Sequence, residues 1–231
     1  MTSNKDLKRI YDRIWSGARD RALGNAMACD SPPEFGETRW GLSLILRVPF
    51  RESIAGICPE LIAHAGGGQF CYDSSNFHMT LRSIEGYRGD IPTGDRRARI
   101  YAERVAELLP HLRGLSITLQ GLTCGNSSVL VQGWPSVDLQ AFRVALFQAL
   151  EGIEISVPGG EISAERVRNT AHASLLLLNG PLADPAGFVE FIDQNRAREF
   201  GAFTPEAAEL VFYRRTRKET FVETLASLPI A

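Results

Sequence analysis

The chain has 231 residues, of which 44% are hydrophobic and 23% are charged, and its formal net charge is −2. This composition is typical of one generous globular domain or of two closely packed lobes. The weak negative charge argues against a partner such as duplex DNA, because broad binding of duplex nucleic acid needs a strongly basic surface.

The cysteines and the apolar segments bound the class of protein further. The four cysteines, Cys29, Cys58, Cys71 and Cys124, lie far apart and form no Cys-x-x-Cys pair, so we expect neither a disulfide framework nor a zinc site. The N-terminus is rich in charge and has no apolar run of the kind found in signal peptides. No apolar stretch approaches the ~20 residues of a membrane span. We therefore expect a cytoplasmic protein with no cofactor and no membrane partner.

Helices and strands alternate in the first half of the chain. Residues 4–24 are expected to be helical, because Leu7, Ile10 and Ile14 begin an apolar series at three- and four-residue steps. This helix either packs on the outside of the domain or serves as a lid or a partner-binding element. A strand is expected over residues 40–50 and a strand or hairpin over residues 69–84, with a short helix from Pro59 between them. A helix capped by Thr93 follows.

The second half of the chain continues in the same way. Residues 115–123 alternate between apolar and polar side chains, and residues 129–134 return after a turn. Ser136 is expected to cap a helix, and Asp184 with Pro185 to begin another. Further strands are predicted over residues 170–178, 210–216 and 220–225.

The order of these elements repeats. Strand, helix, strand, helix and strand describe residues 40–123 and again residues 128–216, as expected for an internal duplication with a pseudo-two-fold axis. Mixed helices and local strand pairing favour an α+β fold. We expect an N-terminal helical extension over residues 1–36 and one bilobal domain over residues 37–231. The two repeats and a C-terminal strand would form its lobes, with mainly antiparallel sheets facing a central cleft and helices outside.

Two short motifs occupy the same position in the two repeats. His78 precedes Thr80 by two residues, and His172 precedes Ser174 by two, each at the start of an apolar segment. Residues i and i+2 of a strand share a face, so each histidine has a hydroxyl beside it. A duplication would bring both pairs to one cleft. The alternative is that the two histidines are satisfied core residues.

This pair of His-x-Thr/Ser motifs, one in each half, resembles the 2H phosphoesterase superfamily. That group includes the 2′-5′ RNA ligase-like proteins and cyclic nucleotide phosphodiesterases. The resemblance covers residues 40–231, and it implies a bilobal fold with His78, Thr80, His172 and Ser174 as the catalytic set. Phe77 and Ala171 stand where the family often has proline.

The chemistry of these side chains suits a phosphodiester. Two imidazoles can divide the proton transfers at neutral pH, and the two hydroxyls can donate to the non-bridging oxygens. No metal ion is required, and the chain has no convincing acidic cluster that would bind one. Arg82 follows the alternation of His78 and Thr80, so it is expected either to pair with phosphate or to be a solvated strand end. Tyr213 is expected either to stack on a base or to be an ordinary strand residue.

Three functional classes follow from this pattern. The first is a metal-independent phosphoesterase that hydrolyses a cyclic phosphodiester of the 2′,3′-cyclic nucleotide or RNA-end type. The second is a non-catalytic module that binds nucleotides or RNA ends with the same cleft, and the third is a purely structural domain. In the first two, the partner is a small nucleotide or an RNA-end phosphate. The pattern does not indicate an oligomeric state.

Overall fold

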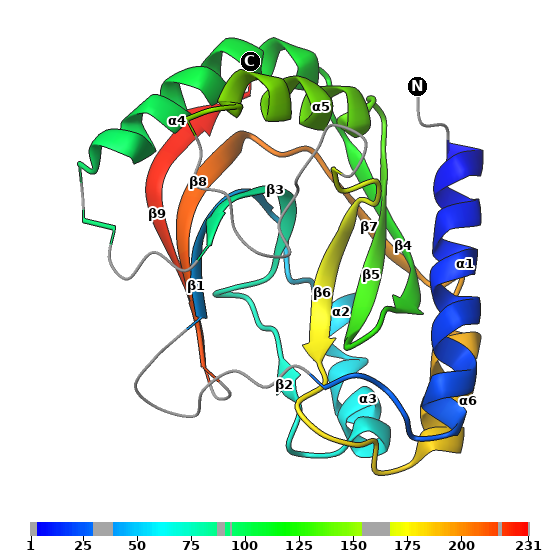
Figure 1. Cartoon of the computed structure of the whole chain (residues 1–231). Helices are drawn as coiled ribbons and strands as arrows, with labels where there is room; N and C mark the ends of the chain where they lie inside the picture. The colour runs from blue at the N-terminus through cyan, green and yellow to red at the C-terminus, as the bar shows by residue number, and fades with distance from the viewer. Residues whose placement is uncertain are drawn as a thin grey trace.

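The structure is a computed structural model that describes residues 4–29, 39–86, 91–92, 94–153, 167–216 and 219–230. In these residues, nine strands form one continuous sheet in which every pairing is antiparallel. The sheet curls into a half-barrel with helices packed around it (Figure 1). The expected α+β class with mainly antiparallel strands is therefore confirmed.

The strands follow one another across the sheet in the order β7-β4-β5-β6-β3-β1-β8-β9, and β2 pairs with β6 beside this path. Their bounds are β1 Arg39–Arg47, β2 Phe70–Cys71, β3 His78–Gly86, β4 Ile117–Cys124, β5 Ser128–Pro135, β6 His172–Leu177, β7 Glu199–Phe203, β8 Ala207–Arg215 and β9 Thr220–Pro229. The two strands that begin with the motif histidines, β3 and β6, are thus neighbours at the centre of the sheet. They pair at Met79 and Ala173.

This order divides the sheet into two halves of four strands. We call β3-β1-β8-β9 the first half-sheet and β6-β5-β4-β7 the second. The innermost strands carry the two motifs, and the next strands outward, β1 and β5, are the first strands of the two predicted repeats. β4 ends the first repeat but pairs with β5, and β8 ends the second repeat but pairs with β1. The two repeats therefore exchange their last strands. The division into an N-terminal extension and one bilobal domain stays a prediction.

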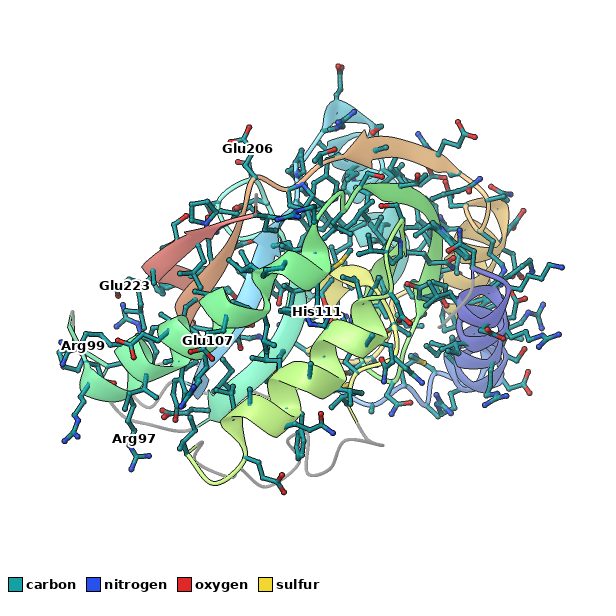
Figure 2. The ribbon with its side chains drawn as sticks, turned by 90° about the horizontal axis from the view of Figure 1, so that it is seen from above. Arg97, Arg99, Glu107, His111, Glu206 and Glu223 are labelled. Carbon is teal, nitrogen blue, oxygen red and sulfur yellow. The ribbon has the colours of Figure 1, made fainter. Side chains whose placement is uncertain are left out.

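Helices pack against both half-sheets. Their bounds are α1 Asn4–Leu23, α2 Glu52–Ala55, α3 Cys58–Ala65, α4 Arg96–Leu108, the short 3₁₀ helix Leu109–Leu112, α5 Leu139–Leu150 and α6 Pro185–Gln194. α4 and α5 lie side by side (Figure 2) and contact β9 and β3. α6 contacts α3 and β4. Arg97 and Arg99 of α4 are exposed on the outside of this layer. Among the described helices, none is long and apolar enough to cross a lipid bilayer.

Carboxylates cap the helices that follow the first motif strand. Asp95 caps α4 by accepting from the backbone N–H of Ala98; Thr93, the predicted cap, lies outside the described residues. Asp138 caps α5, so the prediction of Ser136 as its cap is wrong. The Ser136 hydroxyl instead accepts from the backbone N–H of Ser116 and joins the ends of β4 and β5.

Asp184 caps α6 as predicted, with Pro185 at the first helical position. Its side chain accepts from the N–H of Gly187 at 3.0 Å. Cap, proline and apolar spacing agree here, which is why the start of this helix could be read from the sequence.

Candidate functional site

The register of the two central strands brings the two motifs together. β3 and β6 are antiparallel and pair at Met79 and Ala173. Continuing this register by one residue in each direction sets His78 opposite Ser174 and Thr80 opposite His172. Met79 and Ala173 are fully buried on one face, so the four motif side chains share the other. The two imidazoles are then diagonal neighbours, at a spacing that is about 7–8 Å in an antiparallel pair.

The imidazole of His78 is held by its own strand entry and by two tyrosines. Its Nδ1 lies 2.7 Å from the backbone carbonyl of Asn76. A carbonyl oxygen only accepts, so Nδ1 carries a proton and Nε2 is the nitrogen left for chemistry. The rings of Tyr72 and Tyr213 each lie 6.0 Å from the His78 ring in edge-on contact. Their hydroxyls are 3.2 Å apart, so Tyr213 does lie beside the first motif.

The imidazole of His172 has two side-chain partners from the segment that leads into β6. The hydroxyl of Thr170 lies 2.8 Å from Nδ1, and Nη1 of Arg168 lies 3.0 Å from Nε2. A guanidinium only donates, so Nε2 accepts and Nδ1 carries the proton. Both histidines thus have the same tautomer, and in both the group bound to Nδ1 belongs to the residue two positions earlier.

The surroundings hold both imidazoles neutral. Burial lowers the pKa of His172 well below its ordinary value, and the charges of Arg168, Arg143 and nearby His78 lower it further. Burial also lowers the pKa of His78, an effect that the bond to the Asn76 carbonyl opposes and the charges of Arg47 and Arg168 reinforce. In the absence of an anion, both histidines therefore rest as bases.

Arg82 lies away from this face, so the expectation that it lines the same face as His78 and Thr80 is not met. Thr80 pairs with Ile45, but Arg82 pairs with Leu44, which leaves Leu81 as a bulge in β3. Because Leu44 and Ile45 point to opposite sides of β1, Arg82 points away from Thr80. Its side chain is 1% exposed and its guanidinium lies 4.6 Å from the centre of the Phe147 ring on α5.

The N-terminal helix packs on the face of the sheet that carries the motifs. Gln132 of β5 pairs with His172 and so shares its face, and Trp134 follows two residues later. The ring of Tyr11 packs edge-on against Trp134 at 5.4 Å. The Tyr11 hydroxyl accepts from the N–H of Ala171 at 3.1 Å and also lies against the Ala171 carbonyl. α1 therefore forms a side of the site and is anchored next to His172.

Several residues of this arrangement escaped the sequence analysis, namely Tyr11, Arg47, Tyr72, Arg143, Arg168 and Thr170. Asn76 and Thr170 stand two residues before their histidines, a polar repeat that was visible in the chain. The others come from a helix, a neighbouring strand or an irregular segment, where spacing along the chain indicates no face. In the described part of the chain, no group of three or more His, Cys, Asp or Glu side chains is placed to hold a metal ion.

Comparison with known proteins places the architecture. No family model matches the chain, and no curated protein matches it in sequence. Among solved structures, a conserved protein of unknown function from Agrobacterium tumefaciens, ATU0111, is 13% identical with a TM-score of 0.54, over 90% of this chain and 97% of that one. TT0787 of Thermus thermophilus is 14% identical with a TM-score of 0.53, over 82% and 97%.

Escherichia coli LigT, in a crystal structure with ATP, is 14% identical with a TM-score of 0.51, over 84% of this chain and 99% of LigT. The chain has the LigT fold. This is the fold that the resemblance to the 2H phosphoesterases implied, so that resemblance is confirmed at the level of architecture. Almost all of each LigT-fold structure is matched, whereas part of this chain lies outside the match.

Proposed function

We propose that this protein is a metal-independent phosphoesterase that hydrolyses a cyclic phosphodiester, of the 2′,3′-cyclic nucleotide or RNA-end type. The observation that carries the proposal is the shared face of His78, Thr80, His172 and Ser174 at the centre of the sheet. In both imidazoles Nδ1 is bonded and Nε2 is the basic nitrogen, which in His172 accepts from Arg168 before substrate binds. An imidazole whose Nε2 is its basic nitrogen can take a proton there as a base and, once protonated, give it back as an acid.

In the proposed reaction, the oxygen of a water molecule attacks phosphorus, and one imidazole Nε2 takes the proton that the water loses. The bond from phosphorus to one ribose oxygen breaks, and that oxygen takes a proton from the other imidazole. The products are a phosphomonoester and a free ribose hydroxyl. One imidazole must start protonated, and the negative charge of a bound phosphodiester favours this. The Thr80 and Ser174 hydroxyls donate to the non-bridging oxygens.

Two observations support this substrate class, one from the site and one from a protein with the same fold. Tyr72 and Tyr213 place two aromatic rings beside His78, where a base or ribose of a small nucleotide can pack. LigT, which shares the fold, has been crystallised with the nucleotide ATP. The alternative is a module that binds nucleotides or RNA ends with these residues and does not cleave them.

The test is the set of variants His78→Ala, His172→Ala and the double variant, assayed on a 2′,3′-cyclic nucleotide with and without EDTA. Each single variant should lose activity on the order of 10²–10⁴-fold, the usual share of one proton-transfer group. The double variant should be little worse, because groups that act as a unit are strongly non-additive. EDTA should have no effect.

His111→Ala is the matched control, because His111 is an exposed histidine on the 3₁₀ helix after α4. It should retain full activity. Tight binding of the nucleotide without any turnover would favour the binding module instead. Activity that EDTA abolishes and a divalent metal restores would contradict a metal-independent reaction.

A further inference from the structure

A phosphoester anion needs positive charge, and the resting histidines do not supply it. Among the described residues, the cations whose charge acts on the two imidazoles are Arg47, Arg143 and Arg168. These three arginines have different hydrogen-bond and ion-pair partners. Nε of Arg47 forms an ion pair with Glu209 at 3.0 Å, and its Nη1 donates to a backbone carbonyl at 3.1 Å. Arg143 is 1% exposed and donates to backbone carbonyls.

Arg168 differs because its guanidinium forms a hydrogen bond to the very imidazole nitrogen that is proposed to transfer a proton. Its Nη1 donates to Nε2 of His172 at 3.0 Å, and its charge acts on both His172 and His78. Nε2 of His172 is the atom that must exchange a proton during hydrolysis. The guanidinium therefore stands where the phosphoryl group has to come.

We propose that Arg168 is the phosphate-binding arginine of this site, a role that was one of the two expectations for Arg82. On substrate binding, its Nη1–H would leave Nε2 of His172 and donate to a non-bridging phosphate oxygen. Charge-assisted bonds from a guanidinium to phosphate oxygens are about twice as strong as neutral ones. The exchange also frees Nε2 of His172 for proton transfer. This inference rests on the proposed function, since it takes the ligand to be a phosphoester.

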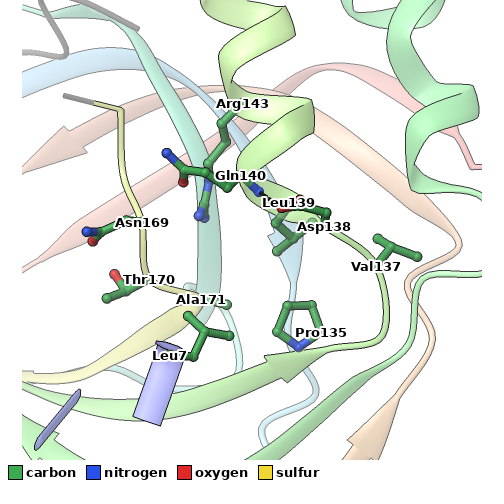
Figure 3. A pocket seen from close by; sticks show the side chains of 10 residues that line it. All are labelled: Leu7, Pro135, Val137, Asp138, Leu139, Gln140, Arg143, Asn169, Thr170 and Ala171. Carbon is green, nitrogen blue, oxygen red and sulfur yellow. Dashed lines mark hydrogen bonds between the residues drawn. The ribbon is translucent and has the colours of Figure 1, made fainter. Parts of the chain in front are cut away.

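The backbone of Arg168 is fastened to the first motif strand by Arg143. From α5, Nη1 of Arg143 donates to the carbonyl of Arg168 at 3.0 Å. Its Nε and Nη2 donate to the carbonyls of Leu81 and Thr80 at 2.8 and 3.1 Å. Figure 3 shows Arg143 extending from its helix into the pocket that Thr170 and Ala171 also line. Arg143 is thus a positioning residue, which keeps the base of the Arg168 side chain at a constant place relative to both motifs.

The experiment compares Arg168→Met and Arg168→Lys with the wild type and with Arg196→Met. Arg196 is a matched control because it is also partly buried and forms an ion pair with Asp12, at the turn after α6. Three quantities are measured: kcat and KM for a 2′,3′-cyclic nucleotide, the Kd of inorganic phosphate by calorimetry, and the histidine titrations by NMR. Thermal melts check that each variant is folded.

For Arg168→Met we expect kcat/KM to fall on the order of 10²–10³-fold, as for the loss of one preorganised donor to a developing charge. Phosphate should bind at least about tenfold more weakly. The two site histidines should titrate at higher pH, because a neighbouring positive charge has been removed. Arg168→Lys should recover part of the phosphate affinity through its charge, and it keeps the proposal testable where the methionine variant does not fold.

The outcomes separate this inference from the proposed function. If the wild-type protein binds phosphate but cleaves no cyclic nucleotide, and Arg168→Met loses phosphate binding, the proposed hydrolysis is contradicted and the phosphate-binding role of Arg168 is supported. If the wild-type protein cleaves the nucleotide, and Arg168→Met has unchanged kcat/KM and phosphate affinity, the role proposed for Arg168 is overturned and the proposed hydrolysis is not affected. Equal losses in Arg196→Met would also overturn it.

Discussion

Each motif histidine is oriented by the residue two positions before it. For His78 the partner of Nδ1 is the Asn76 carbonyl, and for His172 it is the Thr170 hydroxyl. A bond at Nδ1 selects the tautomer and leaves Nε2 as the basic nitrogen. The two histidines thus have the same tautomer, which is selected by a backbone acceptor for His78 and by a side chain for His172. This agreement is stronger support for a working pair than the spacing of the motif alone.

The depressed histidine pKa values predict how stability depends on pH. Above about pH 6.5, the ordinary histidine pKa, the two imidazoles are neutral in the folded and the unfolded chain. Below it, the unfolded histidines bind protons while the folded ones, whose pKa values are lowered by burial and by arginine charges, stay neutral. Protonation then stabilises the unfolded state relative to the folded one. The free energy of unfolding therefore decreases as the pH is lowered from about 6.5, until the pH reaches the lowered pKa values of the folded protein. Each group contributes a slope of at most about 1.4 kcal/mol per pH unit.

Urea unfolding at pH 7.5 and 5.5 checks this pH dependence. The double variant His78→Gln with His172→Gln should lose less stability between the two pH values than the wild type, by roughly 1–3 kcal/mol. His111→Gln, at an exposed histidine, should keep the wild-type difference. An identical pH dependence in all three proteins would show that the site histidines are not held neutral in the folded state.

The motif pairs could be predicted from sequence, because a strand alternates with period two and its apolar residues mark the buried face. The same rule failed for Arg82. One bulge residue, Leu81, shifts the alternation and turns the arginine to the helix side. A bulge is set by strand pairing, which the sequence does not display. Arg168 lies in an irregular segment, so its contact with His172 had no periodicity from which it could be predicted.

At the scale of elements, α1 was predicted with nearly its observed length, but its place was left open. Its buried side is Leu7, Tyr11, Trp15, Ala18 and Ala22, whereas Ile10 and Ile14 of the predicted apolar series are only half-buried. Spacing reveals that a helix has a buried side, not which face of the sheet covers it. The structure shows that it covers β4 and β5 on the motif side, through Trp134 and Thr123.

Tyr11→Phe tests whether α1 supports the site. Tyr11 is 1% exposed, and its hydroxyl bonds to the backbone of Ala171 and Gly133 at the entry to the second motif strand. Removing it leaves buried backbone groups without this partner, at a cost of about 1–3 kcal/mol in the free energy of unfolding. Activity should also fall, because Ala171 adjoins His172. Ser16→Ala, at an exposed position of the same helix, should change neither quantity.

At the scale of the molecule, the two half-sheets are built from interleaved segments of the chain. The first half-sheet takes β1 and β3 from the N-terminal part and β8 and β9 from the C-terminal part, while β4 to β7 fill the second. Because β4 and β8 are exchanged between the repeats, neither repeat can complete a half-sheet alone. Arg143 adds a link, since this α5 residue holds the carbonyls of Leu81 and Arg168 on either side of the centre.

This interleaving predicts one cooperative unfolding transition rather than one for each half-sheet. Leu210 of β8 and Leu119 of β4 are buried at 0% and 1% exposure and occupy exchanged strands. Leu210→Ala and Leu119→Ala should each cost about 2–5 kcal/mol. Each should lower the hydrogen-exchange protection of core amides in both half-sheets by the same free energy, since global unfolding is their shared route to exchange. Urea unfolding followed by circular dichroism and by tryptophan fluorescence should give coincident curves. If Leu210→Ala weakened only the amides of the first half-sheet, the halves would be independent folding units, and the exchanged strands would not couple the two motifs.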